Sequence, residues 1–147
     1  MKTLLLFITL FAFMQSAFLP INLVLVVIIA RGLSFDDRDN LILAFFGGLI
    51  LAFLNQVNLG YYPLIFLLII KFSGLIKKLP ISFNPLMIFL SGSLLISLTA
   101  FLNSLFINQY LEIYPHLVEV ILVLPAYFLI KLWEEKFIVK SYIKLKI

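Results

Sequence analysis

The sequence predicts an all-α polytopic membrane protein, a bundle of six transmembrane helices with five as the alternative. The prediction rests on composition: 64% of the 147 residues are hydrophobic, 12% are charged, and the mean hydropathy is +1.19. A soluble domain contains nearer to ~45–50% apolar and ~25% charged residues, because much of any folded surface must face water. A lipid bilayer is the solvent that suits this composition. We therefore expect neither a soluble enzyme nor a nucleic-acid-binding protein.

Apolar runs separated by short polar breaks divide the chain into six candidate spans. The runs cover residues 3–19, 20–33, 41–54, 61–76, 83–107 and 115–133. A bilayer core about 30 Å thick needs ~17–25 helical residues. The first, fifth and sixth runs meet this length, whereas the second and third are shorter. Strands are a poor alternative, because no run alternates apolar and polar residues.

The first two runs could instead form one span from Leu4 to Ala30, kinked at Pro20, which gives five helices and an external N-terminus. A helix of about 27 residues would extend ~40 Å. That is too long for one bilayer core without heavy tilt. We therefore favour two spans that separate at Pro20.

Charged residues mark the ends of the third and fourth runs. Asp36, Asp37 and Asp39 precede the third run, and we expect them to cap its helix. They lack the glycine and the terminal glutamate of an EF-hand loop. Lys71 lies about two turns inside the fourth run, and we expect its long side chain to extend to the cytoplasmic rim.

The positions of the basic residues predict the topology. If the N-terminus is cytoplasmic, all eleven Lys and Arg residues fall on one side of the map, and the three breaks on the other side carry none. Positive residues favour the cytoplasmic side of a membrane. We therefore expect both termini in the cytoplasm, a single transmembrane domain over residues 1–133 and a basic cytoplasmic tail over residues 134–147.

Two stripes of small residues lie on candidate spans. They are Ala44, Gly47, Gly48 and Ala52 in the third run, and Ser93, Ser97, Ala100 and Ser104 in the fifth. Small residues at this spacing let helix backbones approach closely in lipid. Two interpretations stay open, namely packing within the chain and docking of a partner protein.

A candidate polar cluster faces the outer side. Glu119 is the only carboxylate well inside a predicted span, and His116 lies three residues before it on the same face. Asn103, near the outer end of the fifth run, could complete the cluster. Charge inside a membrane is costly and is a functional-site hypothesis by default. The alternatives are a hydrogen-bonded cluster that sets helix register and a site that handles a ligand or a proton.

The basic tail is a candidate contact surface. Lys136, Lys140 and Lys144 recur at steps of four beside apolar residues. This pattern is typical of a helix on the anionic inner leaflet, and a partner protein is the alternative.

The residue inventory argues against an enzyme. With one histidine and no cysteine, the usual zinc ligand sets cannot be assembled. The chain carries no Walker loop or dinucleotide fingerprint. A Ser93–His116 pair would lie at opposite ends of their spans, so hydrolase chemistry lacks its geometry. We expect no catalytic residue, no metal and no cofactor.

An ordered set of features runs through residues 20–78. Pro20 opens a short apolar segment that ends at Arg31 and a polar break, an apolar helix with Gly-Gly-Leu at 47–49 follows, and a loop closes with Leu-Gly at 59–60. In these features the chain resembles the MreD family of rod-shape-determining membrane proteins. It departs from the family's usual Pro-Asp, since Ile21 follows the proline here.

The resemblance implies a non-enzymatic scaffold in the bacterial cytoplasmic membrane. Proteins of this family belong to the cell-elongation machinery that directs peptidoglycan synthesis. They associate with a bitopic partner, MreC, and through it with actin-like filaments and peptidoglycan synthases. The family usually carries an aspartate shortly after its Gly-Leu, where this chain has Ala52 and then Asn55.

The same resemblance supplies an alternative function. The fold of the family is similar to that of the six-helix substrate-binding subunits of energy-coupling-factor vitamin transporters. Such a subunit would need an outer polar pocket, for which Asn103, His116 and Glu119 are the candidates.

Overall fold

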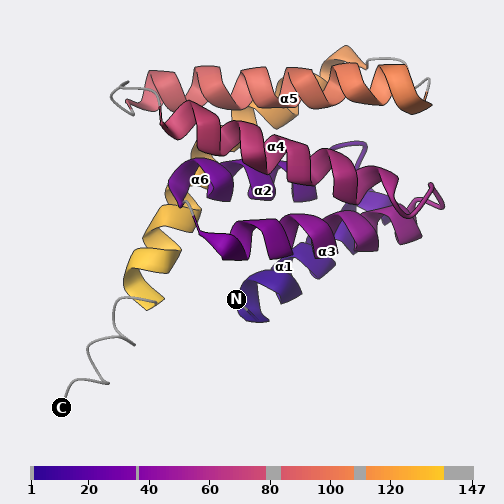
Figure 1. Cartoon of the computed structure of the whole chain (residues 1–147), viewed down its shortest axis with the longest axis horizontal. Helices are drawn as coiled ribbons and strands as arrows, with labels where there is room; N and C mark the ends of the chain where they lie inside the picture. The colour runs from indigo at the N-terminus through magenta and orange to yellow at the C-terminus, as the bar shows by residue number, and fades with distance from the viewer. Residues whose placement is uncertain (1, 36, 79–83, 108–111, 138–147) are drawn as a thin grey trace.

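The computed structural model describes residues 2–35, 37–78, 84–107 and 112–137, which form six α-helices and no strand (Figure 1). The helices are α1 (Lys2–Ala17), α2 (Leu23–Ser34), α3 (Arg38–Leu54), α4 (Tyr61–Lys77), α5 (Pro85–Ile107) and α6 (Ile113–Phe137). The predicted all-α class and the choice of six helices over five are confirmed. Each helix lies within a few residues of the run that predicted it.

The break between α1 and α2 is capped by side chains. The Asn22 side-chain oxygen accepts a hydrogen bond from the backbone N–H of Leu25 at 3.0 Å. Near the end of α1, Gln15 accepts the N–H of Val24, also at 3.0 Å. A helix start otherwise leaves these N–H groups without partners. The caps favour a second helix over one kinked span, and they place its start at Leu23 rather than at residue 20.

The start of α3 also differs slightly from its predicted position. The helix begins at Arg38 rather than at residue 41, because Asp37 accepts a hydrogen bond from the N–H of Asn40 at 3.2 Å. The expected aspartate cap is therefore confirmed at Asp37.

The end of α6 differs more. The helix continues past residue 133, the end of the predicted run, to Phe137. The physical reason is Glu134, which is 4% exposed and packs inside the bundle. Lys136 is an exposed helical residue. Lys140 and Lys144 lie outside the described residues.

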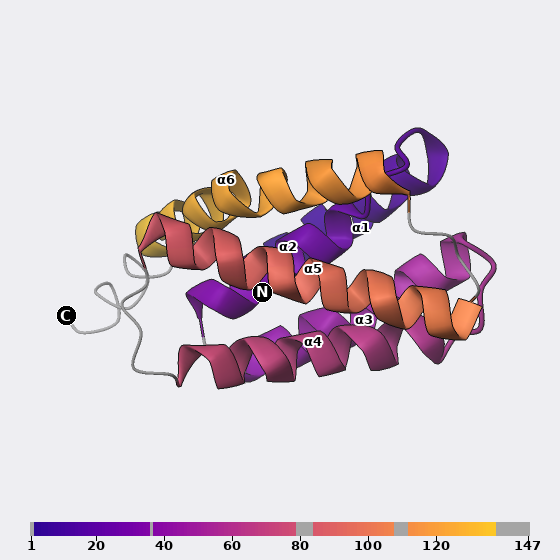
Figure 2. The same ribbon diagram turned by 90° about the horizontal axis from the view of Figure 1, so that it is seen from above.

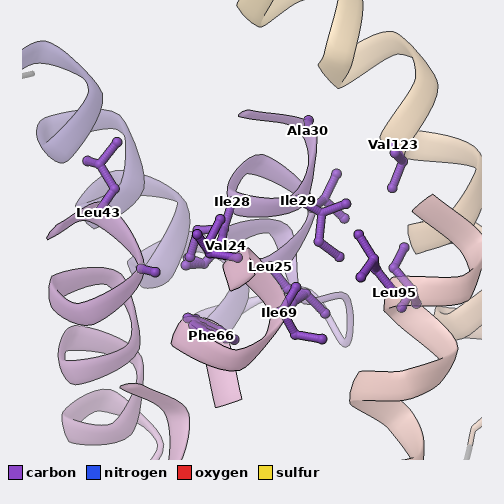
Figure 3. Close-up of a cluster of buried hydrophobic side chains, with 14 of the residues drawn as sticks. Val24, Leu25, Ile28, Ile29, Ala30, Leu43, Phe66, Ile69, Leu95 and Val123 are labelled. Carbon is purple, nitrogen blue, oxygen red and sulfur yellow. The ribbon is translucent and has the colours of Figure 1, made fainter. Parts of the chain in front are cut away.

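α2 is the central helix, and it contacts all five others (Figures 1 and 2). Its buried residues include Val24, Leu25, Ile28, Ile29 and Ala30. In Figure 3, Leu25 lies beside Ile69 of α4, and Ile29 lies toward Leu95 of α5 and Val123 of α6. Val24 and Ile28 lie on the side of α3, where they pack against Gly47. A helix that is apolar on all sides is either a core helix or a membrane span. The second run, one of the two shortest, forms the core of this bundle, since α2 contacts every other helix.

The small residues of α3 allow it to lie very close to α4. A Cβ atom on Gly48 would lie 2.5 Å from the backbone nitrogen of Pro63. A Cβ atom on Gly47 would lie 3.2 Å from Ile8 in α1. Ala44 and Ala52 are fully buried. This stripe is therefore covered by α1, α2 and α4, and in this structure it packs within the chain.

The outside of the bundle is strongly apolar. Large apolar side chains are exposed on every helix except α2, among them Phe13, Phe53, Phe106 and Leu129 at 58%, 73%, 70% and 67%. α5 and α6 are long and apolar enough to span a membrane. Only 28% and 22% of their most apolar windows are buried, whereas the core helix of a soluble protein is mostly buried.

The close approach of α3 and α4 predicts the effect of adding one methyl group. We expect Gly48→Ala to lower the free energy of unfolding by about 1–3 kcal/mol, the usual cost of overpacking. Alanine gains about 1 kcal/mol in helix propensity, but the clash is with backbone that cannot rotate away. Denaturant titration in detergent, followed by the fluorescence of the single tryptophan, Trp133, measures the change.

Gly60→Ala is the matched control, because a Cβ atom there would meet nothing within 4 Å. Equal stability of the two variants would contradict the close contact of α3 with α4.

Candidate functional site

A buried cluster of charged and polar groups joins three helices at one end of the bundle. Arg31, at the end of α2, donates from Nε to Glu134 Oε1 of α6 at 2.8 Å. Its Nη1 and Nη2 atoms donate to the two oxygens of Asp37, before α3, at 3.1 and 3.0 Å. Nη1 also donates to Asn40 in the first turn of α3. We call these four residues the Arg31 cluster.

Burial makes this pairing obligatory. The side chains of Arg31 and Glu134 are each 5% exposed, whereas that of Asp37 is 43% exposed. An unpaired charge in such surroundings carries a large desolvation cost, which hydrogen bonds and an opposite charge offset. The planar guanidinium presents donors in several directions and can therefore bind two carboxylates at once. The cluster thus fixes the relative positions of α2, α3 and α6.

Sequence patterns alone do not predict this cluster, because they place Arg31 at the end of an apolar segment and Glu134 in the tail. The signal was present in the sequence, because a basic and an acidic residue each adjoin an apolar run on the same predicted side of the membrane. Opposite charges in that position are expected to pair.

A second contact holds the other end of α2. Glu119 Oε1 in α6 accepts a hydrogen bond from the backbone N–H of Asn22 at 2.7 Å. A carboxylate beside the start of a helix is favourable, since the first N–H groups lack partners within the helix and carry partial positive charge. Glu119 therefore connects α6 to the start of α2.

The other two residues of the predicted outer cluster bind elsewhere. Asn103 of α5 accepts a hydrogen bond from the Tyr61 hydroxyl of α4 at 2.7 Å. His116 Nε2 lies 3.4 Å from the Ser97 hydroxyl of α5. Among the described residues Asn103, His116 and Glu119 make no hydrogen bond to one another, so the structure does not join them into one cluster. The hydropathy pattern predicts that all three side chains lie near the same side of the bundle. Which of them contact one another depends instead on which helices pack together.

The small-residue stripe on α5 differs from that on α3. Ser97 and Ser104 are exposed, and Ser93 and Ala100 are partly exposed. The Ser93 hydroxyl donates to the carbonyl of Leu90 in its own helix at 2.9 Å. The α5 stripe therefore remains accessible beside α6, unlike the α3 stripe.

The polar side chains of these clusters already form hydrogen bonds, and this limits the reactions in which they could take part. No buried side-chain nitrogen or oxygen in the part of the chain that the structure describes lacks a hydrogen-bond partner. Within the same ranges, no three His, Asp or Glu side chains lie close enough to hold a metal ion. The arrangement connects helices to one another.

No protein-family model, no curated protein and no solved structure matches this chain. The resemblance to the MreD family and the expected likeness to transporter subunits therefore depend on the sequence features alone.

The Arg31 cluster predicts a large effect of removing one carboxylate. We expect Glu134→Ala to lower the free energy of unfolding by about 3–5 kcal/mol, the usual cost of breaking a buried pair, because Arg31 then remains buried with only one of its two carboxylate partners. The same denaturant titration, monitored by circular dichroism, measures the loss. Glu135→Ala is the control, since its side chain is exposed.

The double variant Arg31→Met/Glu134→Leu separates pairing from packing. It should recover much of the loss, because it removes both desolvated charges. A Glu134→Ala variant as stable as Glu135→Ala would show that the pair does not hold α6 in place.

Proposed function

We propose that this chain is a non-enzymatic, multi-pass scaffold of the bacterial cell-elongation machinery. In this proposal all six helices lie in the cytoplasmic membrane and both termini face the cytoplasm. The chain binds a bitopic MreC-like protein through its helices, and through that partner it connects to actin-like filaments and peptidoglycan synthases.

One observation carries the proposal. The buried polar side chains are used to hold the helices together, as in the Arg31 cluster and the Glu119–Asn22 contact, while the outer surface is apolar on five of the six helices. Such a molecule can present a shaped apolar surface to lipid and to other membrane helices. It offers little for chemistry.

The distribution of charge supports the proposed topology. Apart from Lys2 at the start of α1, the described basic residues lie toward the end of α2, at the start of α3 and in the second halves of α4 and α6. The Arg31 cluster brings three of these four segments together, and Figures 1 and 2 show the ends of α4 and α6 toward the same side. Positive charge gathered at one end of a bundle favours that end as the cytoplasmic one.

The α5 stripe is the best surface for a partner helix. Small residues allow close approach of a second helix, and the equivalent stripe on α3 is already covered by the chain itself. Ser97 and Ala100 lie near the middle of the exposed stripe. A bitopic protein contributes a single span, which fits one such face.

The transporter-subunit alternative is less well supported. It needs an outer polar pocket, and Asn103, His116 and Glu119 are each occupied by a contact within the chain. Tight binding of a vitamin by the purified chain would favour that alternative over a scaffold.

The scaffold proposal predicts co-purification of a partner. In mild detergent, the wild-type chain should retain a bitopic membrane protein of the cell-elongation machinery. Ala100→Leu should reduce the yield of that partner at least several-fold, because the added side chain holds a second helix away from the stripe. Quantitative mass spectrometry of the purified complexes measures the yield.

Leu94→Phe is the matched control, since it adds bulk at an exposed position of α5 outside the stripe. Equal partner yields from the two variants would exclude the stripe as the docking face. A wild-type preparation without any bitopic partner would contradict the scaffold function itself.

The topology can be tested by labelling, and the absence of native cysteine makes each introduced thiol unique. We expect Asn58→Cys, in the exposed loop between α3 and α4, to react with a membrane-impermeant maleimide in intact cells. Glu135→Cys, exposed near the end of α6, should react only after the membrane is permeabilised. Labelling of Glu135→Cys from outside would overturn the proposed orientation.

A further inference from the structure

A pocket of about 430 Å³ lies between the start of α3 and the end of α4, beside the Arg31 cluster. We call it the rim pocket. Its lining includes three basic residues, Arg38, Lys71 and Lys78, together with the acidic Asp37. Its volume falls in the range of ~300–1,000 Å³ that is common for small-molecule sites.

The charge in the rim pocket is unbalanced toward positive. Asp37 and Glu134 share the single guanidinium of Arg31, so the Arg31 cluster keeps one excess formal negative charge beside three cations, and the balance at the pocket stays positive. Arg38, Lys71 and Lys78 are all exposed. Among the described residues, these three cations form no ion pair with a carboxylate.

The positions of these cations define a groove. Lys71 and Lys78 are seven residues apart, which is about two turns of helix, and so they lie on nearly the same face of α4. Arg38 is the first residue of α3. A bound anion between the two helices could thus be reached by long side chains from both.

Apart from Asn40, Ser73 and two glycines, the uncharged residues of the lining are apolar. Leu41 of α3 and Leu75 of α4 line the same pocket and are 37% and 57% exposed, and Ile70 forms part of its inner wall. A site for a fully water-soluble anion gains nothing from exposed leucines. Cations beside exposed apolar side chains match an amphipathic ligand instead.

We propose that the rim pocket binds the phosphate-bearing headgroup of an anionic phospholipid, with Arg38, Lys71 and Lys78 around the phosphate and the start of an acyl chain against Leu41 and Leu75. Basic pockets between helices at the cytoplasmic side of a membrane suit such headgroups. This inference rests on the membrane placement and orientation of the proposed function. It does not depend on the MreC-like partner.

The test is a lipid titration of the purified full-length chain in neutral detergent, with binding counted by native mass spectrometry. Phosphatidylglycerol should bind saturably, and phosphatidylcholine, which has no net charge, should bind more weakly. Arg38→Gln/Lys71→Gln should weaken phosphatidylglycerol binding about 30-fold, since each cation near an anionic headgroup contributes about fivefold. Lys78→Gln alone, at the last turn of α4, should weaken it about fivefold.

Lys131→Gln is the matched control for Lys78→Gln. It removes one exposed cation near the same end of the bundle, on α6 and outside the pocket, and it should leave the affinity unchanged. If Lys131→Gln and Lys78→Gln lose affinity equally, the attraction is a diffuse surface effect and the pocket assignment is wrong. A thermal melt of each variant checks that the fold is intact.

Soluble glycerol phosphate distinguishes a lipid from a free phosphate. It carries the same anion without acyl chains, so it should displace phosphatidylglycerol only at far higher concentration. Displacement at equal concentration would overturn the lipid assignment in favour of a soluble phosphate ligand.

The result of the lipid-binding test can be distinguished from the result of the test of the proposed function. Ala100→Leu should bind phosphatidylglycerol like the wild type, whatever its effect on a partner. Loss of lipid binding in a chain that still retains its partner would remove only this inference. Labelling of Glu135→Cys from outside would contradict the cytoplasmic placement on which both the proposed function and the lipid site depend.

Discussion

The architecture depends on the need to pair one buried cation. The guanidinium of Arg31 lies at the end of an apolar central helix, where water cannot replace a missing partner. Glu134, which is 103 residues later in the sequence, forms an ion pair with Arg31. Asp37 and Asn40, at the start of α3, accept further hydrogen bonds from the same guanidinium. Since all of these bonds require a specific arrangement of α2, α3 and α6, the pairing selects one packing among the many that apolar contacts alone would allow.

The opposite end of α2 is held by a different kind of bond. Glu119 accepts a backbone N–H at the start of α2, and Gln15 and Asn22 satisfy two more. α6 therefore contacts α2 through a carboxylate at each end, with apolar residues such as Val123 between (Figure 3). A helix of only 12 residues becomes the axis of the bundle because every neighbour is attached to it.

The two stripes of small residues have similar sequence patterns but lie in different surroundings. On α3, Gly48 lets the helix backbone contact that of Pro63 in α4, and the stripe is buried by packing within the chain. On α5, Ser97 is exposed and Ala100 is partly exposed beside α6. The two stripes have similar patterns of small residues, and the position of the helix in the bundle decides whether a partner can reach them. This difference connects the fold to the scaffold function that we propose.

The sequence by itself determined the helices. Apolar runs and polar breaks placed six of them to within a few residues, because the cost of an unpaired backbone in apolar surroundings acts locally along the chain. Capping was readable at Asp37, since a cap involves near neighbours. The tertiary structure alone decided which polar groups meet. Arg31 and Glu134 are 103 residues apart, and Asn103, His116 and Glu119 each bind a residue on another helix or at its start. Such contacts depend on which helices pack together. The hydropathy of a sequence indicates which residues lie inside an apolar segment, but it does not indicate which helices are neighbours in the bundle.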